Sequence, residues 1–178
     1  MTDNASPERP HENCYWLLPG RFLAGEYPGN RDPHKARQRL DRYLDAGVTF
    51  FLDLTEPHEL EPYQPILKEA AAARNLDVEY ERLQIRDVDV PDSPDHMREI
   101  LDTIDAALAD GHTVYLHCWG GIGRTGTTAG CWLVRHGQSG DEALATIARH
   151  WQTVAKRYRQ PRSPETDAQH AYVRHWQE

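Results

Sequence analysis

The sequence lacks any apolar run of the length that a membrane-spanning helix needs. Its first 13 residues are polar and carry Pro7 and Pro10, so they also lack the apolar stretch of a secretory signal. Cysteine is scarce: Cys14, Cys118 and Cys131 form an odd, widely spaced set that suggests no disulfide framework and contains no CxxC pair for structural zinc. These absences predict a soluble, cytoplasmic protein with no membrane partner.

Positive charge is also in short supply. The chain has 20 lysines and arginines against 28 aspartates and glutamates, which gives a formal net charge of -8. A general nucleic-acid binder usually shows a basic face, so we expect no nucleic-acid partner, although a local positive hollow for one phosphate is compatible with this balance. The ten histidines include no HExxH pair. We therefore expect no metal and no cofactor.

What is present fits one globular unit. A length of 178 residues suits a single compact domain, and 39% hydrophobic residues are enough for a packed core. No internal repeat or low-complexity linker divides the chain. We expect residues 1–13 to form a flexible tail and residues 14–178 to form one domain. The oligomeric state does not follow from the sequence, and a monomer is the simplest expectation.

Apolar segments rich in β-branched and aromatic residues predict core strands over residues 48–54, 78–85 and 113–117. Two shorter extended segments flank a turn at Pro19-Gly20. Capping residues and apolar spacing predict helices that begin near residues 33, 65, 94, 124 and 140, and a last one from Ser163-Pro164. Since strands alternate with helices, we expect an α/β fold with a mostly parallel central sheet and helices on both faces.

The segment from His117 to Gly126 reads His-Cys-Trp-Gly-Gly-Ile-Gly-Arg-Thr-Gly, between a predicted strand and a predicted helix. Glycines let backbone N–H groups turn towards one point. The N-terminus of a helix adds free N–H groups and the positive end of its dipole. The glycine-rich loop, residues 118–124, is therefore predicted to bind a tetrahedral dianion such as phosphate.

Cys118 stands at the start of this loop, where the field that attracts phosphate also stabilises a thiolate nucleophile. Arg124 offers a planar fork to two phosphoryl oxygens, a geometry that lysine does not match. We expect Thr125 to hydrogen-bond the sulfur and His117 to order the loop through backbone groups. The expected phosphate-binding residues are Trp119, Gly120, Gly121, Ile122, Gly123 and Arg124.

The alternative is a buried structural cysteine beside a glycine-rich turn, the usual reading of a lone cysteine. Cys118, three glycines, Arg124 and Thr125 at these spacings favour the functional interpretation. A nucleotide-binding loop of the Walker type is excluded, because no Gly-Lys-Ser/Thr follows the glycines.

Chemistry of this kind needs an acid that protonates the leaving group. The acid loop, residues 86–91, follows a predicted strand and should lie at the same edge of the sheet as the glycine-rich loop. Asp87 is the favoured acid and Asp89 the alternative, while Asp92 is a third candidate that we expect to cap the next helix.

The segment HCWGGIGRTG resembles the Cys-x5-Arg-Ser/Thr signature of the protein-tyrosine-phosphatase superfamily, in its small dual-specificity branch. The resemblance extends through FLAGEYPG, DAGVTFFLDLTEPHEL, IRDVDVPD and SPETDAQ, and so covers most of residues 20–176. These segments look like those of one subgroup, which includes the cyclin-dependent-kinase-associated phosphatase and many small bacterial phosphatases.

The resemblance implies a phosphatase catalytic domain in which the Cys118 thiolate attacks phosphorus. Asp87 would protonate the leaving oxygen and then act as the base in hydrolysis of the cysteinyl-phosphate, with no metal. The chain is too short for the extra segments of the long phosphotyrosine-specific enzymes, so a shallow pocket for phosphotyrosine, and also for phosphoserine or phosphothreonine, is expected.

The expected partner is therefore a phosphorylated protein or peptide. The uncharged interior of the glycine-rich loop argues against inositol polyphosphates. Two alternatives stay open: a phosphatase of small-molecule, lipid or inositol phosphates, and a phosphate-binding pseudoenzyme.

A few residues outside these motifs are further candidates. Glu56 and His58 follow a predicted strand and should face the site edge, because ligands gather at the carboxyl ends of parallel strands. Cys131 is expected in the core, with protection of oxidised Cys118 as its alternative role. The sequence leaves a redox role of Cys14 open.

Overall fold

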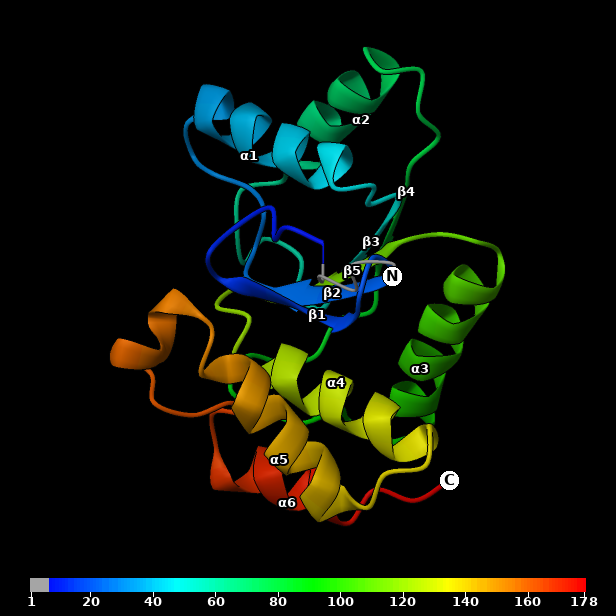
Figure 1. Cartoon of the computed structure of the whole chain (residues 1–178), viewed down its shortest axis with the longest axis vertical. Helices are drawn as coiled ribbons and strands as arrows, with labels where there is room; N and C mark the ends of the chain where they lie inside the picture. The colour runs from blue at the N-terminus through cyan, green and yellow to red at the C-terminus, as the bar shows by residue number, and fades with distance from the viewer. Residues whose placement is uncertain (1–6) are drawn as a thin grey trace, which may run out of the picture.

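The computed structural model describes residues 7–178, and it contains one five-stranded sheet with the order β1-β2-β5-β3-β4 (Figure 1). The strands are β1 (Cys14–Leu18), β2 (Phe22–Gly25), β3 (Phe50–Asp53), β4 (Glu79–Arg82) and β5 (Val114–His117). The helices are α1 (Pro33–Asp45), α2 (Gln64–Ala72), α3 (Pro94–Ala109), α4 (Gly123–Arg135), α5 (Gly140–Trp151), the 3-10 turn η1 (Ala155–Tyr158) and α6 (Asp167–Arg174).

The sheet is mostly parallel, as the alternation of strands and helices predicts. Strands β2, β5, β3 and β4 run parallel to one another, and β1 alone pairs antiparallel, with β2. The β1–β2 connection passes through Gly20, whose φ of +70° a side chain would strain. The predicted turn at Pro19-Gly20 is thus present.

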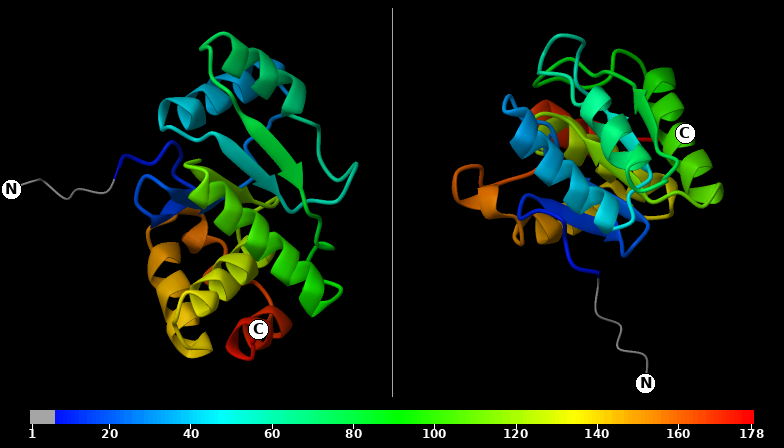
Figure 2. Two further views of the ribbon diagram at one scale, coloured as in Figure 1. Left: turned by 90° about the vertical axis from the view of Figure 1, so that its right-hand side faces the viewer. Right: turned by 90° about the horizontal axis from the view of Figure 1, so that it is seen from above.

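Helices cover both faces of the sheet (Figures 1 and 2). α1 and α2 pack on one face over a core that includes Leu40, Tyr43 and Leu67. α3, α4, α5 and α6 pack on the other face over a larger core. The apolar stripe of α3 is buried as its spacing predicts, and each such side chain contributes roughly 1.5–3 kcal/mol of burial free energy.

The register brings the ends of four parallel strands to one edge. Gly25 of β2 pairs with His117 of β5, His117 pairs with Asp53 of β3, and Asp53 pairs with Arg82 of β4. The loops that leave these four ends are neighbours for this reason, although the chain separates them widely. They include the glycine-rich loop and the acid loop.

Most predicted helix starts are confirmed, and two details are wrong. The predicted capping box at Ser139 is present at the start of α5. α3 is capped by the hydroxyl of Ser93, which accepts a hydrogen bond from His96 N at 3.1 Å, rather than by Asp92. α6 begins at Asp167 behind a Thr166 cap, not at Ser163.

Ser163 has a different role from helix initiation. Its side chain is buried, and its Oγ donates to the carbonyl of Ile122 at 2.7 Å, at the start of α4. This hydrogen bond holds the segment before α6 against the glycine-rich loop. The helix begins only after that segment.

Part of the predicted N-terminal tail makes contacts with the rest of the chain. Residues 1–6 lie outside the described residues. Arg9 Nη1 donates to the carbonyls of Cys14 and Thr153, each at 3.0 Å. Asn13 Oδ1 accepts from Lys156 N at 3.0 Å. Residues 7–13 thus connect β1 to the segment around η1. Over residues 7–178, no helix is both long enough and apolar enough to cross a bilayer.

Candidate active site

The glycine-rich loop leaves β5 at Cys118, which is 3% exposed, and enters α4 at Gly123. Gly121 has a φ of +71°, and a Cβ there would stand 2.4 Å from the carbonyl carbon of Gly25. Only glycine fits this close approach. Tyr27 N donates to the carbonyl of Trp119 at 2.9 Å, so the loop is fastened against the segment that follows β2.

The N-terminus of α4 faces this loop, and its first backbone N–H groups have no side-chain cap. The N-cap residue Ile122 makes no side-chain cap, and the first turn carries no acidic residue. The free N–H groups and the positive end of the helix dipole are therefore available to an anion. The structure thus gives the predicted nest its two components, a glycine turn and an uncapped helix start.

Arg124 is 2% exposed, and both terminal nitrogens of its guanidinium bind Glu59, a residue that is not among the predicted site residues. Its Nη1 lies 2.8 Å from Glu59 Oε2 and its Nη2 lies 2.6 Å from Glu59 Oε1. Nη1 also donates to the carbonyl of Ile85 at 3.1 Å. Burial lowers the pKa of Arg124, but the bonds and charge of Glu59 outweigh it, so the group stays fully cationic.

Glu59 itself is ionised. Burial raises the pKa of this carboxyl, but the hydrogen bonds from Arg124 and from the Glu56 backbone outweigh the effect and lower the pKa below its usual value. Glu59 lies in the loop between β3 and α2, next to the predicted candidates Glu56 and His58. The position of this loop after a parallel strand is the only sequence signal that points to Glu59.

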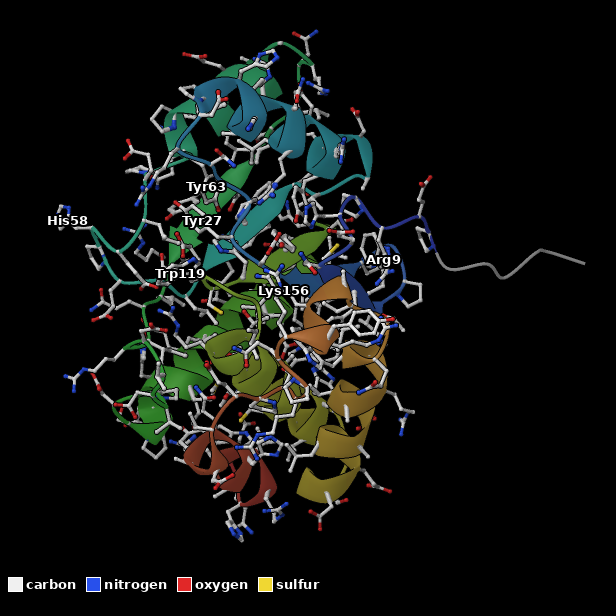
Figure 3. All side chains as sticks on the ribbon, turned by 90° about the vertical axis from the view of Figure 1, so that its left-hand side faces the viewer. Arg9, Tyr27, His58, Tyr63, Trp119 and Lys156 are labelled. Atoms are coloured by element: carbon white, nitrogen blue, oxygen red, sulfur yellow. The ribbon has the colours of Figure 1, made fainter. Side chains whose placement is uncertain are left out.

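The structure places Glu56 and His58 differently. Glu56 Oε2 accepts a hydrogen bond from Asp87 N at 3.2 Å, which links its loop to the acid loop. His58 is exposed, has a φ of +68°, and projects away from the body of the molecule (Figure 3).

Asp87 reaches the site and Asp89 does not. Asp87 Oδ1 lies 2.9 Å from Arg124 Nη2, while the side chain remains 45% exposed. The adjacent Val88 has a φ of +62°, and its N–H donates to Asp87 Oδ1 at 3.0 Å. Asp89 instead uses its carboxylate to accept from Val90 N at 2.8 Å. The structure thus brings Asp87 and Arg124 together, as expected for the favoured acid.

The predicted hydrogen bond from Thr125 to the cysteine sulfur is absent. Thr125 is fully buried, and within residues 7–178 its Oγ1 has no hydrogen-bond partner. The role of Thr125 towards the sulfur therefore stays a prediction. A buried hydroxyl without a hydrogen-bond partner lowers the stability of the fold, and a ligand atom that bonded to it would remove this cost.

The ring of His117 contacts the glycine-rich loop. Its Nδ1 lies 3.2 Å from the carbonyl of Cys118 and 3.9 Å from Asp53 Oδ1, and its Nε2 lies 2.7 Å from the hydroxyl of Tyr63. Complete burial lowers the pKa of His117, so the ring is neutral. Both neighbours of Nδ1 are acceptors, which places the proton there and leaves Nε2 to accept from Tyr63.

Asp53 completes this buried network. Its carboxylate accepts from Thr55 N at 2.8 Å, from Thr55 Oγ1 at 2.7 Å, from the Tyr80 hydroxyl at 2.7 Å and from Arg82 Nη2 at 3.2 Å. Burial raises the pKa of Asp53, but the hydrogen bonds that its carboxylate accepts outweigh this effect, and the pKa is lowered. The fully buried carboxylate of Asp53, next to His117, thus has hydrogen-bond partners.

Gln169 of α6 connects the loops from the other side and is fully buried. Its Nε2 donates to the carbonyl of Asp89 at 3.0 Å, and its Oε1 accepts from Glu165 N at 3.0 Å and from Thr166 N at 3.1 Å. A Cβ on Gly123 would stand 2.8 Å from the same Nε2. One amide therefore links the acid loop to the start of α4. The sequence indicates Gln169 only through the SPETDAQ segment.

The remaining cysteines, Cys14 and Cys131, are buried. All three cysteines lie within the described residues and are free thiols or thiolates rather than disulfides. Burial raises the pKa of Cys14 to about 12 and that of Cys131 higher still, so both remain protonated. Within residues 7–178, no group of three or more histidine, cysteine, aspartate or glutamate side chains could hold a metal ion.

Comparison with known proteins places these observations in a family. A model of the family described as "Polymorphic toxin system, DSP-PTPase phosphatase" matches residues 28–138. The structure of Tk-PTP in its active form is 26% identical, with a TM-score of 0.69, over 90% of this chain and 92% of Tk-PTP.

Two further structures share the fold at lower identity. The kinase associated phosphatase, with its catalytic-site cysteine substituted by serine, is 14% identical, with a TM-score of 0.70, over 90% of each chain. PTPMT1 in complex with PI(5)P is 22% identical, with a TM-score of 0.64, over 90% of this chain and 92% of PTPMT1. The predicted resemblance and the predicted α/β fold are both confirmed.

Proposed function

Because the chain belongs to the DSP-PTPase phosphatase family of polymorphic toxin systems, we propose that it hydrolyses phosphotyrosine in proteins through a cysteinyl-phosphate on Cys118. The family and the fold make the chain a cysteine-dependent phosphatase. The observation that carries the proposal is the cluster at the strand ends: buried Arg124 lies in the first turn of α4, six residues after Cys118, and Asp87 lies 2.9 Å from its guanidinium.

In the first step the Cys118 thiolate attacks phosphorus, and the bond to the leaving oxygen breaks. Asp87 donates a proton to that oxygen, so that a neutral tyrosine departs. The N–H groups of the glycine-rich loop and the Arg124 guanidinium hold the negative charge of the transferring group. Catalysis here consists of positioning and electrostatic stabilisation.

In the second step water attacks the cysteinyl-phosphate, the S–P bond breaks, and inorganic phosphate leaves. Asp87, now ionised, takes the proton from the water. A hydrogen bond to the sulfur would ease its departure as a thiolate. Thr125, whose buried hydroxyl is unpaired, keeps this role as a proposal that requires its side chain to turn once the phosphoryl group is bound.

The loop interior supports a phosphoprotein substrate. Residues 119–123 carry no charge, and only Trp119 is largely exposed, at 56%. Trp119 offers an aromatic plane at the rim on which a tyrosine ring can pack. Phosphoserine and phosphothreonine are further candidates, because the 178-residue chain lacks room for the segments that deepen the pocket of long phosphotyrosine-specific enzymes.

A second candidate is a phosphatase of lipid or other non-protein phosphates. PTPMT1, whose structure contains PI(5)P, has the same fold as this chain. A phosphate-binding pseudoenzyme is a third, and the joint presence of Cys118, Arg124 and Asp87 speaks against it, because selection for binding alone would not require an acid.

The test compares hydrolysis of a phosphotyrosine peptide, a phosphothreonine peptide and phosphatidylinositol or inositol phosphates by the wild type and by Cys118→Ser. We expect the phosphotyrosine peptide to be hydrolysed fastest and Cys118→Ser to be inactive on every substrate. Denaturation during turnover should trap phosphate covalently on the wild-type chain. A preference above about tenfold for an inositol phosphate, or about 1.4 kcal/mol, would contradict the proposal.

A further inference from the structure

A cleft of about 520 Å³ opens beside the glycine-rich loop. Its lining comes from five separate parts of the chain: the segment after β2 with Tyr27 and Arg31, Arg39 of α1, the loop before α2, Trp119 and Lys156. In Figure 3, Tyr27, Trp119 and Lys156 lie on the same face of the molecule, and His58 projects outward at the margin. The mechanism proposed above gives this cleft no role.

The cleft is continuous with the catalytic loop. Trp119 belongs to both, and its carbonyl accepts from Tyr27 N at 2.9 Å. Lys156 Nζ donates to the carbonyl of Gly120 at 3.1 Å. Glu59, which also lines the cleft, holds Arg124. A substrate whose phosphoryl group sits in the glycine-rich loop must therefore extend past the mouth of this cleft or into it.

The cleft is lined by three carboxylates and three cations, and most of them are paired. Glu26 is 8% exposed, and its carboxylate is neutralised by Lys156 at 2.5 Å, with His11 and Arg39 also close, at 3.2 and 3.6 Å. Glu59 is neutralised by Arg124. These two carboxylates therefore offer little repulsion to an incoming anion.

The other two cations of the lining are Arg31 and Arg39, of which Arg39 already lies 3.6 Å from Glu26. Arg31 is exposed, and within residues 7–178 its side chain has no hydrogen bond or ion pair. Arg39 Nη1 donates to the carbonyl of Tyr27 at 3.2 Å, and the rest of its guanidinium, on a side chain 26% exposed, remains open. Glu61, which is exposed, is the third carboxylate of the lining. The formal charge of the lining is therefore close to zero, in contrast to a net charge of -8 for the whole chain.

We propose that the cleft binds a second anionic group of the substrate, placed next to the phosphotyrosine and held by Arg31 and Arg39. A guanidinium pair can bind a carboxylate or a phosphoryl group through forked hydrogen bonds. Trp119 forms the partition between this subsite and the phosphate nest. The cleft then determines which phosphopeptides are hydrolysed efficiently. This inference rests on the proposed function, since it concerns the flanks of a phosphotyrosine.

The test uses three phosphotyrosine peptides that differ only at the residues beside the phosphotyrosine: glutamine, glutamate, or phosphoserine. Release of tyrosine is followed by its fluorescence, so that loss of phosphate from serine is not counted. For the wild type we expect kcat/KM to be at least about threefold higher for one or both anionic peptides than for the glutamine peptide, as exposed ion pairs allow. The preference should weaken in high salt, because screening shortens the range of such attractions.

Arg31→Glu is the informative variant, because an exposed side chain without partners can be reversed in charge with little risk to folding. It should abolish or invert the preference for anionic flanks. Arg149→Glu, which makes the same charge change on the exposed surface of α5 outside the cleft, should keep the wild-type ratio. A preference for the glutamate peptide identifies a carboxylate as the ligand, and a preference for the phosphoserine peptide alone identifies a phosphoryl group.

Binding gives a readout that does not depend on turnover. Anisotropy of labelled peptides with Cys118→Ser, with and without Arg31→Glu, should show the same loss of anionic preference. Equal affinity of all three peptides for Cys118→Ser, or an unchanged ratio in the double variant, would overturn the subsite. Failure of the proposed function looks different: the wild type would then hydrolyse none of the phosphotyrosine peptides.

Discussion

Asp87 Oδ1 lies 2.9 Å from Arg124 Nη2, so the acid expected to protonate the leaving group lies on the guanidinium expected to hold the phosphate. Glu59 binds the same guanidinium through both of its terminal nitrogens. A phosphoryl group that binds Nη2 has to displace Asp87 and leave Glu59 in place. Binding of substrate and release of the acid towards the leaving oxygen are therefore coupled.

This coupling makes a specific prediction for Asp87→Asn. The variant should lose kcat by about 10²- to 10⁴-fold, the range typical of a removed general acid. It should also bind inorganic phosphate and vanadate several-fold more tightly, because a neutral amide competes less for Arg124 than a carboxylate does. Steady-state kinetics and the inhibition constant of phosphate measure the two effects separately.

Asp89→Asn is the matched control, since Asp89 bonds to Val90 N rather than to Arg124. Its kcat and phosphate affinity should stay near the wild-type values. Retained activity in Asp87→Asn together with loss in Asp89→Asn would move the acid to Asp89. An unchanged inhibition constant in Asp87→Asn would show that Asp87 does not compete with phosphate.

Glu59→Gln should impair phosphate binding through Arg124. Glutamine can accept only one of the two hydrogen bonds that the fork donates, and it removes the charge that balances a guanidinium 2% exposed. We expect kcat/KM to fall by about 10- to 100-fold, as misplacement of a substrate-binding group does. Thermal unfolding should show a loss of about 1–3 kcal/mol, the cost of an imperfectly satisfied buried polar group.

The control for this prediction is Glu69→Gln, an exposed glutamate of α2. It should leave both kcat/KM and the unfolding transition unchanged. If Glu59→Gln behaved in the same way, Asp87 and the carbonyls of Ile85 and Leu54 would be enough to hold Arg124.

Gln169→Leu should act through the acid loop. The variant removes the hydrogen bond to the carbonyl of Asp89, two residues after Asp87, and keeps most of the side-chain volume. Poor placement of an acid matters most when the leaving group is basic, so the loss in kcat should be about tenfold or more for phenyl phosphate. It should be much smaller for an activated nitrophenyl ester.

An exposed glutamine supplies the comparison: Gln152→Leu, just after α5, should affect neither ester. Equal losses of Gln169→Leu on both esters would instead mean that Gln169 supports the nest itself, through its approach to Gly123.

Local patterns explain what the sequence could predict. Strand composition, the capping box at Ser139 and the Cys118–Arg124 spacing each lie within a few residues of one another, so they can be read along the chain. The sheet edge follows from them, because parallel strands bring their carboxyl ends together. Asp87 could be predicted for this reason, because it is a carboxylate in a loop that leaves that edge.

The contacts that the sequence did not predict join residues far apart. Glu59 and Arg124 are 65 positions apart, and Gln169 and Asp89 are 80 apart, so no local spacing marks them as partners. The late start of α6 has the same origin, because Ser163 is drawn to the carbonyl of Ile122 by a long-range hydrogen bond. Thr125 differs from these residues: its position in the motif is recognisable from the sequence, but the sequence does not show that its buried hydroxyl lacks a hydrogen-bond partner.

The buried carboxylate of Asp53 predicts how the fold responds to acid. Its pKa in the folded chain is lowered, so it binds protons less readily there than in the unfolded chain. Its contribution to the free energy of unfolding is therefore complete above the unfolded value of about 3.9 and is lost as the pH falls through the lower folded value. The relevant window lies below about pH 4.

Asp53→Asn isolates this contribution. At pH 7 the variant should be less stable by about 1–3 kcal/mol, because Arg82 and Tyr80 lose a charged acceptor. The difference between variant and wild type should shrink as the pH is lowered from 4 to 2.5, measured by urea unfolding at each pH. Asp95→Asn, whose side chain is 91% exposed, should show no such dependence. A difference that stays constant across this range would mean that Asp53 titrates alike in both states, and that its hydrogen bonds do not depend on its charge.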